Sequence, residues 1–188
     1  MTVLYPKYDI PRKPPCKYPE YSVESENHLT IFEATRKTCE VQNFSRMLQE
    51  TPSNLMTPRI FAQRIVNQVK IWGLEGKVEV FVRGVDWIKE QKMGSFLGVA
   101  MGCIEENPPV FLEVHLNRID TDQNPDLSFV GKGITFDAGG ISIKLDQTGM
   151  MGMKSDMGGA AVTMATVLGA AWLNLTDKYR GFFKNVVF

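Results

Sequence analysis

Residues 129–161, which read FVGKGITFDAGGISIKLDQTGMMGMKSDMGGAA, restrict the possible fold of this chain more than any other stretch. Lys132, Lys144, Asp137 and Asp156 lie there among closely spaced glycines, in a segment that otherwise looks buried. Charged side chains are rarely buried without a partner or a metal. Glycine pairs beside them permit tight turns or a close approach of the backbone. The stretch therefore predicts a functional site.

The local pattern predicts a strand and then a helix around this site. Residues 127–136 are mostly apolar or β-branched apart from Lys132, as in a strand that is buried on both faces. Residues 157–173 are small and apolar, and their length favours a helix. Asp137 is thus expected at the carboxyl end of a strand and Asp156 at the start of a helix, where α/β proteins often bind ligands.

Lys132 and Asp137 need a backbone irregularity if they are to meet. They are five residues apart, so an ideal strand would direct the two side chains to opposite faces. Gly131 and Gly133 flank the lysine and would allow a bulge. We therefore expect the strand to bend at these glycines.

Ordinary explanations exist for most of these residues when each is taken alone. Lys144 fits a solvated surface lysine, Asp156 fits a helix cap, and the methionines of residues 150–157 fit core packing. Lys132 has no such explanation, because it interrupts an apolar strand. The combination favours a site over a set of unrelated surface residues.

The rest of the chain predicts an α/β layered domain, with a small mixed sheet of three to four strands flanked by helices. The signals are helical spacing of apolar residues, a proline at the start of a helix, and valine-rich or proline-preceded runs. The predicted elements before the site are a helix at residues 27–50, a helix from Pro58, a strand at residues 77–83, a short helix at residues 85–93, a glycine-containing connection at residues 94–102 and a strand at residues 110–116.

Two motifs of the central stretch resemble a known family. VGKGITFDAGGISIK followed by MKSDMGGAA resembles the metal-site signature of the cytosolic leucine aminopeptidases, which are two-metal exopeptidases. NFSRMLQETPSNLMTPRIFAQ and MGSFLGVAMG resemble the start of that family's catalytic domain. The resemblance covers residues 43–175. It implies that residues 27–188 form the N-terminal portion of this catalytic domain, incomplete relative to the whole.

The resemblance implies a role for five residues. Lys132 matches an unusual lysine that binds metal, Asp137 a carboxylate that bridges both metals, and Asp156 a carboxylate at the tighter metal site. Lys144 matches a lysine that polarises the scissile carbonyl and stabilises the oxyanion. Met153 matches a methionine that lines the pocket for the first side chain of the substrate.

The chain departs from the family pattern in several places. Ala138 stands where the family usually has serine, and the interval from Lys144 to Asp156 is one residue longer than in animal relatives. A motif resembling NTDAEGR, which supplies two further acidic ligands and a catalytic arginine, is absent, as is the family's N-terminal domain. Two dications carry four positive charges and Asp137 plus Asp156 only two negative ones. We therefore expect one ion or none here, against two in the family.

The chemistry of such a site follows from its ligands. A lysine that binds metal must be neutral, and holding a lysine amine deprotonated at pH 7 costs on the order of 4–5 kcal/mol. Burial and an adjacent dication would have to offset this cost. Oxygen and amine ligands suit zinc or manganese, and magnesium or cobalt are compatible as well.

Two hypotheses about function remain open at this stage. In the first, the chain is a metal-dependent aminopeptidase that removes leucine-like N-terminal residues from peptides, with Lys144 stabilising the oxyanion. In the second, it is a truncated, catalytically inactive relative or fragment that associates with full-length aminopeptidase subunits. The resemblance implies a hexamer for those subunits, so a homo-oligomer is a possible state of this chain.

Composition excludes other classes of function. The 188 residues contain 21 basic and 21 acidic side chains, which gives no support for binding nucleic acid or a membrane. Cys16, Cys39 and Cys103 are widely spaced and predict free thiols. With no apolar leader or spanning segment, a cytoplasmic location is expected. Residues 1–26 are rich in proline and predict a disordered extension.

Overall fold

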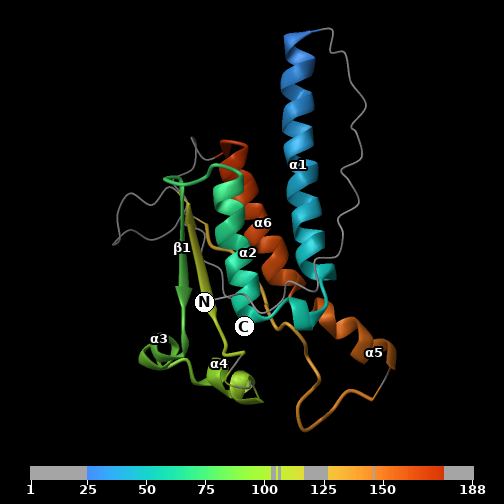
Figure 1. The fold of residues 1–188 in the computed structure, drawn as a ribbon, viewed down its shortest axis with the longest axis vertical. Helices are drawn as coiled ribbons and strands as arrows, with labels where there is room; N and C mark the ends of the chain where they lie inside the picture. Colours follow the sequence, from blue (N-terminus) through green and yellow to red (C-terminus); the bar gives the residue numbers. More distant parts are fainter. Residues whose placement is uncertain (1–24, 103–104, 106, 117–126, 146, 176–188) are drawn as a thin grey trace. The chain divides into compact units, whose positions relative to one another are not determined.

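The computed structural model describes residues 25–102, 105, 107–116, 127–145 and 147–175 (Figure 1). These residues form helices and one small sheet, which confirms the predicted α/β class. The chain divides into two compact units after Glu33, inside the first helix. Nearly all of the predicted extension at residues 1–26, with Cys16, lies outside the described residues, as does Cys103. The boundary of the predicted extension at residue 26 stays a prediction. Cys39 is described and is an exposed free thiol.

Three long helices occur where the sequence predicts helices. They are α1 (Glu26–Glu50), α2 (Pro58–Ile71) and α6 (Gly158–Trp172). Pro58 occupies the first turn of α2 after the extended residue Thr57, which is the position where proline is best tolerated in a helix. Small residues in α6 allow close packing. A Cβ on Gly169 would lie 2.9 Å from the Val41 side chain of α1.

The sheet consists of β1 (Val78–Arg83) and β2 (Phe111–Leu116), which pair antiparallel. Val78 lies opposite Leu116 and Arg83 opposite Phe111. One face of the sheet contributes Val78, Leu112, Val114 and Leu116 to the main core, as the period of two residues in a strand requires. In β2 the side chains of Phe111 and Glu113, between these positions, are buried as well. Both strands confirm the sequence prediction, with their starts shifted by one residue.

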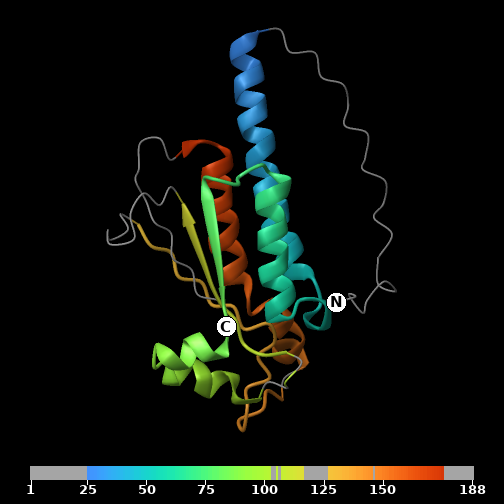
Figure 2. The same cartoon turned by 60° about the vertical axis from the view of Figure 1, so that its left-hand side comes forward.

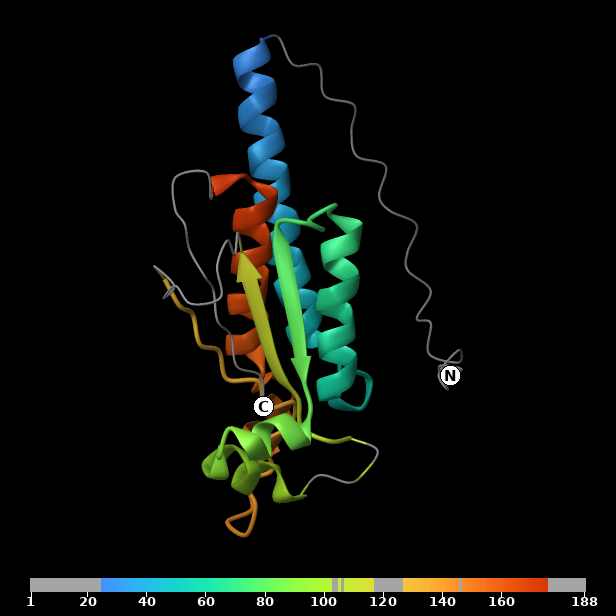
Figure 3. The same ribbon diagram turned by 90° about the vertical axis from the view of Figure 1, so that its left-hand side faces the viewer.

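The main core lies between this face of the sheet and the helices α2 and α6, with the second half of α1 packed beside them. Figure 3 shows both helices behind the two strands, and Figure 2 shows the same layers from another side. Trp72 and Trp172 stack at 4.5 Å between ring centroids. The fully buried members of largest volume are aliphatic, aromatic or methionine side chains: Phe61, Leu48, Met56, Ile65, Leu74, Leu112, Leu116, Met157, Met164 and Leu168.

A smaller apolar cluster follows β1. It contains Ile88 from α3 (Val85–Glu90), Phe96 from α4 (Gly94–Val99) and Phe111 from β2. The sequence predicted a glycine-containing connection at residues 94–102, where the structure has helical turns. The segment forms α4 and the 3-10 turn η3 (Ala100–Gly102), because Phe96 is buried against the aromatic ring of Phe111 and anchors a helical turn despite the glycines.

The strand predicted at residues 127–136 is not formed. This segment is extended, but among the described residues β1 and β2 pair only with each other. Val130 is 71% exposed, so burial on both faces was also wrong. A strand requires a neighbouring strand that supplies a ladder of hydrogen bonds. The described neighbour of this segment is the helix α6, which contacts Gly131 and Lys132. The sheet therefore has two strands in the described residues, against three to four predicted.

Three short elements lie between the longer ones, the first between α1 and α2 and the other two between the extended segment and α6. They are the 3-10 turn η2 (Ser53–Leu55), the helix α5 (Gln147–Gly152) and the 3-10 turn η4 (Met153–Ser155). Within the described residues, no helix combines the length and the apolar character that crossing a membrane requires.

Candidate metal site

The extended segment and the start of α6 bring Lys132 close to two aspartates. Its Nζ lies 2.7 Å from Oδ2 of Asp156 and 3.9 Å from Oδ2 of Asp137. Lys144 lies on the other side of Asp137, with 3.2 Å between Nζ and Oδ2. Two amines and two carboxylates thus alternate in one chain of ion pairs. The four charged residues singled out by sequence meet at one place.

Asp156 does not act as a helix cap in this structure. The N-cap of α6 is Met157, and no side chain makes a capping hydrogen bond there. The Asp156 side chain is 19% exposed and is directed towards Lys132. Its Oδ2 is shut off from solvent and accepts no hydrogen bond from the described residues, and the Lys132 amine lies 2.7 Å away as an ion-pair partner. This oxygen therefore depends on the positive charge beside it, as a metal ligand would.

Asp137 is held by the turn that follows it. The backbone N–H of Gly139 donates to Oδ1 at 2.9 Å, and Gly139 and Gly140 both have positive φ values, of 91° and 71°. The N–H of Lys144 donates to the carbonyl of Ala138 at 3.0 Å and closes the loop. The glycine pair is therefore required for a tight turn, which returns Lys144 to Asp137 across the intervening residues.

The extended segment around Lys132 packs against α6 with almost no space between the two backbones. A Cβ on Gly131 would lie 2.5 Å from the carbonyl oxygen of Gly159, and the N–H of Ala160 donates to the carbonyl of Lys132 at 2.8 Å. A bulge needs a paired strand, and this segment pairs with none among the described residues, so the predicted use of the flanking glycines for a bulge was wrong. The chain bends at Thr135 instead, and this bend lets Lys132 and Asp137 converge.

The site is more open than the sequence predicted. The Lys132 side chain is 50% exposed, and the apolar residues Phe136 and Ile143 that follow it are exposed as well. Without paired strands on either side, the segment cannot enclose the amine. Lys132 lies at the surface of the described chain rather than in a buried strand.

The pKa of the Asp137 carboxyl lies below its ordinary value. The largest cause is the hydrogen bond from the backbone of Gly139, and the second is the hydrogen bond from Lys144. The charges of Lys144 and Lys132 act in the same direction, while desolvation opposes them. The surroundings of Asp137 therefore favour its ionised form, which is the form that binds metal.

This pKa predicts a loss of stability in acid. Because the folded chain binds the proton of Asp137 less tightly than the unfolded chain, the carboxylate stabilises the fold above about pH 4. The contribution disappears as the pH falls through the lowered folded-state pKa. We expect carbon-13 NMR titration to give a pKa for Asp137 below 3.8. Lys144→Met should raise this pKa only partway, since the Gly139 N–H remains, and an unchanged pKa would contradict the assignment.

The donors present suit a single divalent ion. Two carboxylates and one amine are hard oxygen and nitrogen ligands of the kind that bind zinc or manganese. No group of three or more histidine, cysteine, aspartate or glutamate side chains converges within the part of the chain that the structure describes. Lys132 would therefore have to complete the set. The roles of Lys132, Asp137 and Asp156 as metal ligands stay predictions.

Two further residues bear on the candidate metal site, Met153 and Ser53. Met153 begins η4, three residues before Asp156, and its half-buried side chain leaves the predicted substrate contact a prediction. Ser53, which the sequence pattern did not single out, contacts the bend of the extended segment. Its hydroxyl donates to the carbonyl of Thr135 at 2.7 Å across 82 residues of chain. No local signal in the sequence could have indicated this contact.

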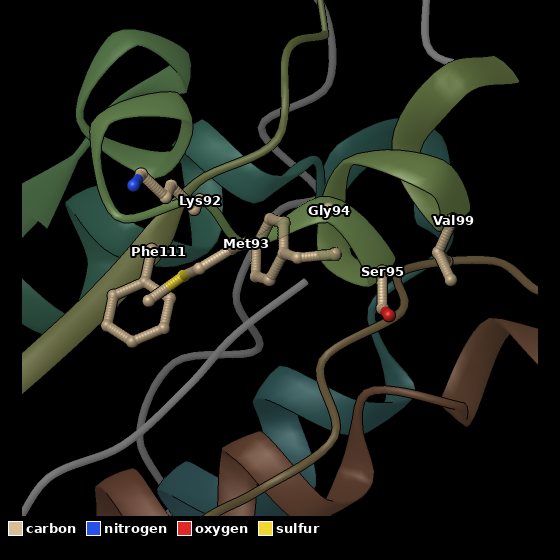
Figure 4. A pocket seen from close by; sticks show the side chains of 7 residues that line it. Lys92, Met93, Gly94, Ser95, Val99 and Phe111 are labelled. Atoms are coloured by element: carbon tan, nitrogen blue, oxygen red, sulfur yellow. The ribbon is translucent and has the colours of Figure 1, made fainter.

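A hollow of about 430 Å³ beside α4 is separate from these ion pairs (Figure 4). Its lining is mostly apolar and contains none of the charged residues predicted for the site. In Figure 4 the Lys92 amine lies at its edge, and Met93 is directed towards Phe111. Its described lining contains no carboxylate, so the hollow offers no ligand set for a metal ion. The hollow is lined by residues 92–96, Val99 and Phe111.

Known proteins are similar to this chain over most of its length. Curated cytosol aminopeptidases match at 48% identity in Dictyostelium discoideum, 52% in Homo sapiens and 41% in Xenopus tropicalis. These alignments cover 77%, 71% and 90% of this chain, but only 27%, 25% and 32% of the respective relatives. The chain therefore spans about a quarter to a third of the length of the curated relatives it matches.

Solved structures agree with the sequence comparison. A mutant of tomato leucine aminopeptidase superposes with a TM-score of 0.63 at 25% identity, over 89% of this chain and 29% of that one. The bottromycin maturation enzyme BotP in complex with Mn gives a TM-score of 0.64 at 25% identity, over 88% and 32%. The model of the cytosol aminopeptidase family, catalytic domain, matches residues 43–185. The chain therefore belongs to the cytosol aminopeptidase family, of whose catalytic domain it contains a part.

Proposed function

We propose that this chain carries the metal-binding part of an aminopeptidase site, which acts on peptides and removes leucine-like residues from their N-termini. The observation that carries the proposal is the position of the Lys132 amine, 2.7 Å from Asp156 and 3.9 Å from Asp137. A nitrogen and two carboxylate oxygens at these distances can be drawn onto one cation by small side-chain movements. Membership of the cytosol aminopeptidase family supports the class of reaction.

We propose one divalent ion rather than two. Asp137 and Asp156 together carry two negative charges, which balance one dication once Lys132 has given up its proton. A second dication would leave an excess of two positive charges at the site. Manganese is a reasonable first choice, because the structurally similar BotP was solved in complex with Mn. Zinc, magnesium and cobalt suit the same ligands.

In this proposal, different residues of the chain bind the metal, contact the substrate and assist catalysis. A bound divalent ion would activate a water molecule and polarise the scissile carbonyl. The closed turn holds the Lys144 ammonium 3.2 Å from Asp137, beside the proposed metal site, and there it would stabilise the oxyanion. Met153, on the turn before Asp156, would contact the first side chain of the substrate.

The partners and the location that we propose for this chain are based on the same family. A peptide is the proposed substrate, and the balanced charge gives no reason to propose a nucleic acid or a membrane. A homo-oligomer, or association with longer aminopeptidase subunits, is proposed on the basis of membership of the cytosol aminopeptidase family. The cytosol is the proposed location, in keeping with the name of those relatives.

The test is hydrolysis of leucine para-nitroanilide by the purified chain with added Mn²⁺ or Zn²⁺. We expect slow release of para-nitroaniline that depends on the metal. Lys144→Ala should reduce it by about 100-fold or more, as expected when an oxyanion-stabilising group is lost. Calorimetric titration with Mn²⁺ separates binding from turnover. Binding without turnover would leave the metal site supported and favour the inactive alternative, whereas a lack of binding would contradict the proposal.

A further inference from the structure

We propose that residues 49–53, which are the last two residues of α1 and the turn that follows them, form a positioning element that holds both halves of the metal site in place. The inference rests on the proposed function, since it assigns a task to residues around that site. One half is the bend at Thr135, which lies between Lys132 and Asp137. The other half is the turn that carries Asp156 into α6. Each half contacts this element directly.

Ser53 makes the contact with the first half. It begins η2 and donates its hydroxyl to the carbonyl oxygen of Thr135 at 2.7 Å, in a partly buried bond. Thr135 is the residue at which the extended segment changes direction. Fixing this peptide group fixes the angle of the bend. The angle decides whether Lys132 and Asp137 face the same cation.

Glu50 makes the contact with the second half. The Lys154 amine donates to the Glu50 carboxylate at 2.8 Å and to the backbone carbonyl of Glu50 at 3.2 Å. Glu50 is the last residue of α1, so its carbonyl has no partner within the helix, and a positive charge is favourable there. Lys154 lies in η4, two residues before Asp156.

Gln49 supports the same half from the other side of Asp156. A Cβ on Gly158 would lie 3.1 Å from Cδ of Gln49, so the amide group packs against the first turn of α6. Asp156 thus lies between two positions, Lys154 and Gly158, that consecutive residues of α1 contact. Because exposed ion pairs contribute little to global stability, we expect the effect of this element to be local to the site.

The first experiment needs no metal. In Ser53→Ala, amide hydrogen exchange followed by NMR should become about tenfold faster at Gly139 and Ala160, the effect of one lost hydrogen bond. These amides bond to Asp137 and to the carbonyl of Lys132. Exchange in β1 and β2 should stay unchanged. Ser53→Thr keeps a hydroxyl and should restore the exchange rates of the unmodified chain.

Thr51 provides the matched control. Thr51 directly follows α1, and its hydroxyl donates to the carbonyl of Met47, in the last turn of that helix, at 2.6 Å. This hydroxyl contacts neither half of the site. Thr51→Val removes this hydroxyl from the same turn, and the amides of Gly139 and Ala160 should then exchange as in the unmodified chain. The inference is overturned if Ser53→Ala leaves both amides unchanged, or if it accelerates exchange equally throughout the sheet.

The second experiment measures Mn²⁺ affinity by calorimetry. Ser53→Ala and Glu50→Gln should each raise the dissociation constant about tenfold, the usual effect of losing a group that orients a metal ligand. Glu40→Gln removes the ion pair with Arg36 from the same helix and should change nothing. If the unmodified chain binds no Mn²⁺ although the amides respond to Ser53→Ala, the proposed function fails and the positioning by this element is supported. Unchanged affinity in both variants of a chain that binds Mn²⁺ overturns the inference.

Discussion

Gly131→Ala is expected to destabilise the chain by about 1–3 kcal/mol, as overpacking of a tight contact does. The new Cβ would lie 2.5 Å from the carbonyl oxygen of Gly159 and 2.5 Å from Oγ1 of Thr163. The backbone carbonyl of Gly159 cannot retreat, because α6 is packed into the main core on its other side. The extended segment must move instead, and the bond from Ala160 to the carbonyl of Lys132 breaks. Urea unfolding measures the loss of stability.

The same displacement carries Lys132 away from Asp156, so Mn²⁺ affinity should fall with stability. Gly152→Ala is the control, since Gly152 has a φ of −71° and open space around the position of a Cβ. It should change the free energy of unfolding by no more than about 0.5 kcal/mol. Equal effects of Gly131→Ala and Gly152→Ala would contradict the close contact between the extended segment and α6.

The helices and the two strands could be predicted because their signals are local. Thr57-Pro58 marks the start of α2, and the small apolar run after Asp156 marks α6 within one residue at each end. The valine-rich run of β1 and the prolines before β2 indicate strands without reference to other parts of the chain. In each case, a few neighbouring residues determine the conformation.

The segment at residues 127–136 could not be predicted in the same way. Its apolar, β-branched pattern is typical of a buried strand, but pairing also needs a neighbour, and no local pattern says whether one is present. The structure provides α6 as the neighbour, and Gly131 and Gly159 serve its close approach rather than a bulge. The sequence pattern thus indicated the unusual residue, Lys132, but the glycine before it allows close packing against α6 and does not form the predicted bulge.

The candidate site shows the same division between local and distant information. The motif indicated which residues to examine, and Lys132, Asp137, Asp156 and Lys144 do come together. Their supports come from far away in the sequence, 82 residues for the Ser53 hydroxyl and 104 for the Lys154 amine. Such contacts depend on how α1 packs against α6, which a pattern of residue types does not specify.

Asp156→Asn is expected to lower Mn²⁺ affinity by more than about 100-fold, since losing a mere outer partner of a ligand already costs 10–100-fold. Asparagine is chosen because it caps helices about as well as aspartate. If Asp156 were only a cap, the substitution would therefore be silent. The structure argues against a cap, since no side chain caps α6 and the Asp156 carboxylate lies 2.7 Å from the Lys132 amine. Calorimetric titration gives the affinity.

The free energy of unfolding shows whether a lower Mn²⁺ affinity comes from the loss of a ligand or from damage to the fold. Lys132 is half exposed and has a second carboxylate, Asp137, at 3.9 Å, so Asp156→Asn should change the free energy of unfolding by no more than about 1 kcal/mol. Asp86→Asn alters an aspartate in the first turn of α3 and should leave Mn²⁺ affinity unchanged. Weak binding by a chain of normal stability then identifies Asp156 as a ligand, because only the charge at the cation has been removed. Equal affinity in the Asp156→Asn and unmodified chains would contradict the metal site itself, since the two remaining ligands could not hold the ion as tightly as three.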